Sequence, residues 1–165
     1  MAVSSIPISV LVIDDNHHMR SLIKELLKAI GINDVREASE PIEALELMKT
    51  VPIDILLVDF SMPMIDGVEF VHMIRTGDDS PNPFIPIIMV TGHSEKSKVI
   101  AARDAGVNEF LVKPINAKSL MMRLQNVIER PRPFIRIASY FGPDRRRGEN
   151  PKFEGPWRRK DDIKG

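Results

Sequence analysis

Short, continuous apolar runs that alternate with helix-length amphipathic segments constrain the fold of this chain most strongly. The runs cover residues 8–13, 53–58, 85–90 and 110–112, and a weaker one surrounds Val35. Apolar runs without polar alternation are typical of strands buried on both faces, as in parallel sheets covered by helices. The pattern therefore predicts five βα units and an α/β fold with a five-stranded parallel sheet.

The segments between these runs carry apolar residues at helical spacing, together with residues that start or stop helices. Gly31 and Gly106 are expected to end helices, Pro41 suits a first helical turn, and Asn116 can cap the last helix. The expected helices cover residues 19–30, 41–48, 67–74, 94–105 and 117–128. The Pro-Arg-Pro sequence at 131–133 is expected to end regular structure, because proline removes a backbone donor.

The composition excludes several classes of site. The chain has no cysteine, so disulfides, thiolate metal sites and cysteine nucleophiles are ruled out. Its first residues have no basic segment followed by an apolar one, so we expect no signal peptide. No stretch approaches the roughly 18 uncharged apolar residues of a membrane span, and we expect a cytoplasmic protein without membrane insertion.

Polar residues follow the predicted strands at the points where these strands end. Asp14 and Asp15 follow the first strand, Asp59 the third, Thr91 the fourth and Lys113 the fifth. Because the carboxyl ends of parallel strands meet at one edge of a sheet, we expect these five side chains to lie together. Asp14 and Asp15 taken alone would also suit a turn or a helix cap.

This set of side chains predicts phosphoryl-transfer chemistry. Three carboxylates in close quarters repel one another, and a divalent cation that prefers oxygen ligands would relieve the repulsion. Mg²⁺ suits a site with few carboxylates, whereas Zn²⁺ would need Cys or paired His ligands. Lys113 offers a compact cation and Thr91 a donor hydroxyl for phosphoryl oxygens, while a carboxylate can act as the nucleophile.

Four motifs in order resemble the receiver domains of two-component response regulators. They are Val-Ile-Asp-Asp at 12–15, Leu-Val-Asp-Phe-Ser-Met-Pro-Met-Ile-Asp-Gly at 57–67, Met-Val-Thr-Gly at 89–92 and Phe-Leu-Val-Lys-Pro at 110–114. The resemblance covers residues 8–129. It implies a doubly wound, flavodoxin-like sheet of strand order 2-1-3-4-5 flanked by five helices.

The resemblance also implies a role for each acidic residue. Asp59 would be the phosphoacceptor, and Asp15 and Asp59 would hold Mg²⁺ together with the backbone carbonyl of Ser61. Asp14 would bind the ion through water. The only catalysis expected is that of the protein's own phosphorylation and dephosphorylation.

The remaining motif positions imply a switch. Lys113 and Thr91 would contact the phosphoryl oxygens, and Thr91 and Phe110 would move together on phosphorylation. The face formed by the fourth helix, fifth strand and fifth helix would then change its protein partners. Lys113-Pro114 occupies a position that is often cis in the family.

We therefore expect a single-domain response regulator. Its phosphodonor would be a sensor histidine kinase or a histidine phosphotransfer protein, and a downstream protein would be its target. It would be a monomer or a phosphorylation-dependent dimer. The alternatives are a phosphorelay intermediate, a haloacid-dehalogenase-like phosphatase, a receiver that never takes phosphate, and a nucleic-acid-binding regulator that acts through its tail.

The C-terminal segment differs in character from the rest, which predicts a receiver domain over 1–130 and a tail over 131–165. The first part holds 13 Lys and Arg against 18 Asp and Glu, whereas the tail holds 10 against 5. We expect the tail to be extended or disordered. It contains Gly-Pro-x-Arg-Arg twice, and the residues expected to bind a partner are Arg145, Arg146, Arg147, Trp157, Arg158 and Arg159. Nonspecific contact with nucleic acid is possible through these arginines, but no DNA-binding fold fits the segment.

Overall fold

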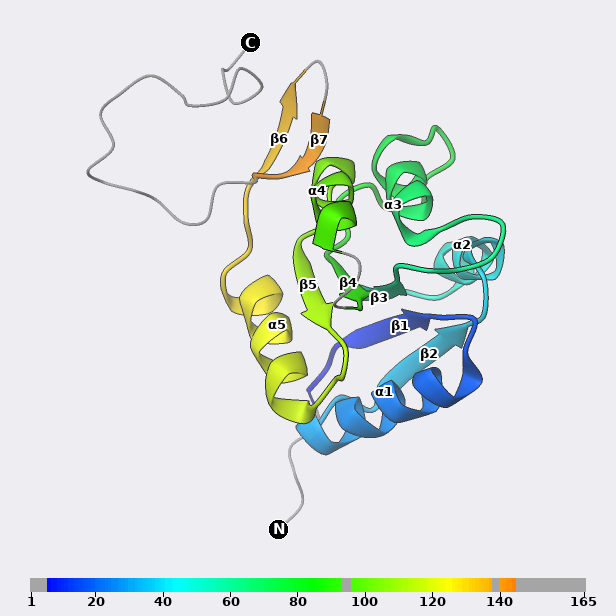
Figure 1. The fold of residues 1–165 in the computed structure, drawn as a ribbon, viewed down its shortest axis with the longest axis vertical. Coiled ribbons are helices and arrows are strands. Elements are labelled where there is room, and N and C mark those ends of the chain that lie inside the picture. Colours follow the sequence, from blue (N-terminus) through cyan, green and yellow to red (C-terminus); the bar gives the residue numbers. More distant parts are fainter. Residues whose placement is uncertain (1–5, 93–95, 138–139, 145–165) are drawn as a thin grey trace, which may run out of the picture.

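The computed structural model describes residues 6–92, 96–137 and 140–144. Five parallel strands form one sheet of order β2-β1-β3-β4-β5, and helices cover both of its faces (Figure 1). The strands are β1 Ser9–Ile13, β2 Asp34–Ala38, β3 Ile55–Asp59, β4 Ile87–Thr91 and β5 Glu109–Val112. The predicted fold class and strand order are confirmed.

Five helices connect the strands: α1 His17–Ile30, α2 Pro41–Thr50, α3 Gly67–Thr76, α4 Lys96–Ala105 and α5 Ala117–Glu129. Successive residues of a strand point to opposite faces, so each strand serves two cores. Leu11 packs with residues of α2, α3 and α4, whereas its neighbour Val12 packs with residues of α1 and α5. Burial on both faces explains why the central strands are continuous apolar runs.

The helix ends follow the local signals in the sequence. Gly31 adopts a φ of 110° and its N–H donates to Leu27, so α1 ends there as predicted. Pro41 lies in the first turn of α2. The Asn116 side chain accepts from the backbone N–H of Ser119, as part of a capping box that starts α5. The cap of α1 is Asn16, so Asp14 and Asp15 are not used as its cap.

Regular structure continues past Pro133, and the prediction that it ends at 131–133 is wrong. Strands β6 Phe134–Ile137 and β7 Tyr140–Pro143 pair antiparallel, and β7 packs against α3 and α4 (Figure 1). The two prolines only precede the hairpin, where no ladder hydrogen bond is needed from them. The folded part therefore extends beyond the expected boundary at residue 130.

The rest of the tail, residues 145–165, lies outside the described residues, and with it the six predicted interaction residues of the tail. No helix in the described part of the chain is both long and apolar enough to cross a membrane.

Candidate phosphoacceptor site

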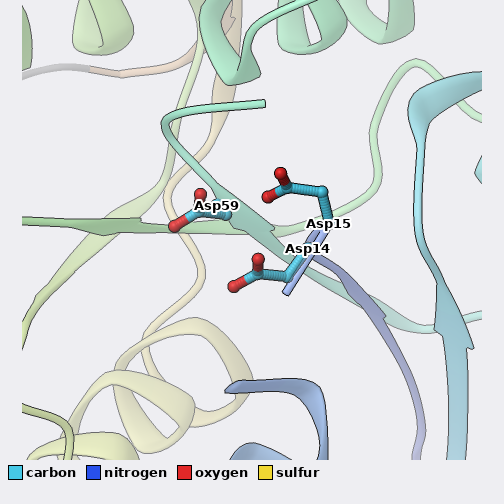
Figure 2. A group of neighbouring side chains, drawn as sticks. All are labelled: Asp14, Asp15 and Asp59. Carbon is cyan, nitrogen blue, oxygen red and sulfur yellow. The ribbon is translucent and has the colours of Figure 1, made fainter. Parts of the chain in front are cut away.

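Three carboxylates converge where β1 and β3 end side by side. Asp14 and Asp15 follow the last residue of β1, Asp59 is the last residue of β3, and Ile13 is in register with Val58. One carboxylate oxygen from each aspartate lies within 4.8 Å of the others, and the three side chains face a common space in Figure 2. The sheet therefore brings together the acidic residues that the sequence predicted.

Lys113 and Thr91 reach the same edge from the next two strands. The Nζ atom of Lys113 lies 3.0 Å from Oδ1 of Asp59. The backbone N–H of Lys113 donates to the carbonyl of Thr91 at 2.8 Å, which ties the ends of β5 and β4 together. The Lys113-Pro114 peptide is cis. Thr91 is buried, and it closes β4 between the strands that carry Asp59 and Lys113.

Burial leaves the acidic cluster electrostatically unbalanced. Asp14 is 3% exposed, and burial raises the pKa of its carboxyl to about 6, with a smaller rise from the charge of Asp59. The backbone N–H of Asn16 opposes this rise by donating to Oδ1 of Asp14 at 2.8 Å. The other oxygen, Oδ2, is buried and has no hydrogen-bond partner among the described residues. A buried, unpartnered carboxylate oxygen is costly unless a cation approaches it.

The donor set fits a magnesium ion. Mg²⁺ prefers oxygen ligands and uses one or two carboxylates while it keeps several waters. Asp15 is exposed, whereas Asp14 and Asp59 are buried, and carboxylate oxygens of all three would be near enough to hold such an ion. Ser61 is exposed two residues after Asp59, and its carbonyl as a ligand stays a prediction.

The predicted switch pair consists of Thr91 on β4 and Phe110 on β5. Phe110 lies on β5 opposite Met89 of β4 and is partly buried against the core shared by α2, α3 and α4. Thr91 ends β4 two residues after Met89. The two residues therefore lie on adjacent strands, and their coupled movement stays a prediction.

The loop after Asp59 holds two features that sequence reasoning missed. A Cβ on Gly67 would lie 2.6 Å from the backbone oxygen of Asp59, so only glycine lets α3 begin so close to Asp59. Met64 has a φ of 70° and a side chain that is 96% exposed. An Asp-Gly pair does signal a turn, but no local pattern marks Met64 as left-handed.

Arg20 is a third residue that sequence reasoning missed. Its guanidinium donates to the backbone carbonyl of Asp14 at 2.6 Å and pairs with Glu37 at 3.2 Å. It therefore links α1, β2 and the loop that carries the acidic pair. In the sequence it looks like any charge on an amphipathic helix, so nothing local could have identified it.

A doubly wound sheet with clustered carboxylates and a paired lysine at its carboxyl edge is the arrangement of an α/β domain that can accept phosphoryl groups. Comparison with known families identifies the member of this class. Residues 10–125 match the response regulator receiver domain, and this chain belongs to that family. It is therefore a phosphoryl-accepting domain of two-component signalling, and receiver domains typically bind Mg²⁺ at an acidic pocket of this kind.

Chemotaxis proteins are among its relatives. Chemotaxis protein CheY-3 of Vibrio cholerae serotype O1 is 32% identical over 121 residues, which span 73% of this chain and 92% of that protein. A CheY homolog of Campylobacter jejuni is 39% identical over 119 residues, which span 72% and 90% of the two proteins. The solved structure of Vibrio cholerae CheY4 matches with a TM-score of 0.66 at 31% identity, over 73% of this chain and 98% of that one.

Proposed function

We propose that this protein is a single-domain response regulator whose phosphoacceptor is Asp59. One observation carries the proposal: Lys113 lies 3.0 Å from a carboxylate that also belongs to a three-aspartate cluster at a strand edge. Within the cluster, Lys113 forms this salt bridge with Asp59. The donor would be the phosphohistidine of a sensor kinase or of a phosphotransfer protein.

The chemistry needs a nucleophile and a means to neutralise charge. A carboxylate oxygen of Asp59 would attack the phosphorus, the N–P bond would break, and the donor histidine nitrogen would take up a proton. Asp15, Asp59 and the carbonyl of Ser61 would hold a Mg²⁺, and Asp14 would bind it through a water molecule. When bound, the ion would neutralise phosphoryl charge. Lys113 and Thr91 would hold the phosphoryl oxygens, since an ammonium and a hydroxyl donate to such acceptors.

The added charge would be read by protein partners. Thr91 would move toward the phosphoryl group and Phe110 would take up the released space, which would repack the face formed by α4, β5 and α5. We place the protein in the cytoplasm, as a monomer or as a dimer formed on phosphorylation. A downstream protein rather than nucleic acid would be its target.

Acetyl phosphate tests the assignment of the acceptor without the cognate kinase. Attack by Asp59 would break a P–O bond and release acetate, and intact-mass measurement would detect one added phosphoryl group when Mg²⁺ is present. We expect this gain in the wild type and in Asp78→Asn, a control at an exposed loop aspartate, and no gain in Asp59→Asn. An unlabelled wild type, or an equally labelled Asp59→Asn, would contradict the proposal.

A further inference from the structure

The β6–β7 hairpin sits on the amino-terminal end of the sheet through a cluster of three phenylalanines. Phe134 of β6 and Phe141 of β7 lie 5.6 Å apart, and Phe84, from the loop before β4, lies 5.3 and 5.4 Å from them. The rings are tilted or edge-on, which are favourable geometries for aromatic pairs. The hairpin is therefore docked on the domain by specific side chains.

A second contact joins the hairpin to the end of α4. Gly106 ends this helix with a φ of 112°, and a Cβ on Gly142 of β7 would lie 3.0 Å from the Gly106 Cα. Arg75 donates to the carbonyl of Gly106 at 3.0 Å, and its guanidinium lies 4.8 Å from the Phe134 ring. Strand β7 thus lies directly on the residue where α4 ends.

The hairpin holds its own shape by polar contacts. The Tyr140 hydroxyl donates to the carbonyl of Pro143 at 2.6 Å, and the N–H of Asp144 donates to the carbonyl of Pro133 at 2.8 Å. The hairpin does not pack against the domain along its whole length, because a cleft of about 240 Å³ lies between β6–β7 and helices α3 and α4. His72, Asp104 and Arg136 are among the residues that line this cleft. Incomplete packing of this kind lowers the free energy of local opening.

Helix α4 has few other means of attachment. Among its described side chains Ala102 is fully buried, but the larger Ile100 is 58% exposed. Its main packing partners are α3 and β7. Its first residue, Lys96, follows Thr91 of the predicted switch closely in the sequence, and its other end is in contact with the hairpin. A helix held by so little apolar burial depends on each remaining contact.

We propose that the β6–β7 hairpin is a clamp on the carboxyl end of α4 that opposes the phosphorylated arrangement of the domain. The proposal rests on the proposed function, since it assumes that α4 takes part in the switch. The clamp stabilises α4 in the position that the structure shows, and the proposal takes the phosphorylated arrangement to move α4 from that position. By linkage, whatever stabilises the position that the structure shows weakens binding of a phosphoryl group or its mimic, and a partner that lifts the hairpin would strengthen it.

Hydrogen exchange and binding of a phosphoryl mimic in the full-length protein test the clamp. Tyr140→Phe removes only the hydroxyl that holds the hairpin, and Phe141→Ala removes the ring that β7 contributes to the docking cluster. Ile42→Ala is the control, because this residue is 59% exposed on α2. Amide exchange is measured along α4 and β1, and the affinity for beryllium trifluoride with Mg²⁺ is measured by calorimetry.

We expect exchange in α4 to become several-fold faster in both hairpin variants, with β1 unchanged, and the mimic to bind about fivefold more tightly. The larger effect should appear in Phe141→Ala and none in the control. Unchanged exchange in α4, or faster exchange with unchanged affinity, would overturn the clamp. A wild type that binds no mimic would instead contradict the proposed function, and the exchange data would still decide whether the hairpin holds α4.

Discussion

Charged groups are buried at both ends of the parallel sheet, and their surroundings differ. At the carboxyl end Asp14 is 3% exposed, with one oxygen that lacks a partner in the described residues. At the amino end Arg75 is 2% exposed, but it donates to the carbonyls of Pro83, Ile85 and Gly106 and to the side chain of Asn108. At the carboxyl end a buried carboxylate oxygen stays unsatisfied within the described part of the chain, and a cation could bind it. At the amino end the buried charge of Arg75 is satisfied by hydrogen bonds that hold separate segments of the chain together.

Arg75 should therefore be costly to remove. Arg75→Met leaves several buried carbonyls without donors, and we expect it to lower the free energy of unfolding by about 3 kcal/mol. Urea denaturation measures the change. Arg36→Met is the matched control, since its pair with Asp34 is roughly half exposed, and we expect a loss of about 0.5 kcal/mol or less. Equal losses would remove the distinction between buried and surface arginine.

Removing the charge of Asp14 should change the free energy of unfolding in the opposite direction. Asp14→Asn replaces a buried, repelled carboxylate by a neutral amide, so we expect the free energy of unfolding without Mg²⁺ to rise by about 1 kcal/mol. Affinity for Mg²⁺ should fall at least about tenfold, because the variant lacks a carboxylate of the cluster. Denaturation in chelator and a Mg²⁺ titration measure the two effects. Asp79→Asn, in an exposed loop, should change neither, and a destabilised Asp14→Asn would show that the charge is already well satisfied.

The raised pKa of Asp14 also predicts how stability depends on pH. The folded carboxyl has a pKa of about 6 against 3.8 in the unfolded chain, so the folded state holds the extra proton between these values. The contribution of Asp14 to stability should be present below pH 4 and be lost as pH rises to about 6. The advantage of Asp14→Asn over wild type should therefore grow across this range and level off above it. Denaturation in chelator from pH 4 to 7 measures the difference in free energy of unfolding between Asp14→Asn and the wild type. If this difference does not change with pH, the pKa of Asp14 is not raised.

Backbone strain in the site loop gives the smallest expected effect. Met64 holds a left-handed backbone that glycine adopts freely, so Met64→Gly should raise the free energy of unfolding by about 0.5 kcal/mol. Met73→Gly in α3 should lower it by about 1 kcal/mol, because glycine is unfavourable within a helix. Thermal denaturation compares the two variants. A loss of stability in Met64→Gly would mean that the exposed side chain makes a stabilising contact.

Much of the fold and the site was open to prediction because the signals are local. Gly31 and Asn116 act on the backbone within a few residues, so their effects do not depend on the rest of the chain. The acidic cluster was predictable for a related reason. Once strands are parallel, the residues that follow them must share an edge, and Asp14, Asp59 and Lys113 do.

The hairpin could not be predicted in this way. The composition of residues 131–165 predicts an extended or disordered tail. Composition indicates polarity, but it does not show that the strand with Phe134 pairs with the strand that contains Phe141. Residues 10–125 match the family, and the hairpin begins after that match ends. The position of the hairpin on the domain depends on contacts with Phe84 and Gly106, and nothing in the tail sequence identifies these two residues.

The sequence by itself determined the five βα units and the residues that end each strand, since apolar continuity and helix signals act over a few neighbours. Tertiary structure alone decided where Arg75 finds its acceptors and where the hairpin rests on α4. The bond from Arg75 to Gly106 spans 31 residues and that to Asn108 spans 33. Such contacts form only when separate elements have packed, so no short stretch of the chain encodes them.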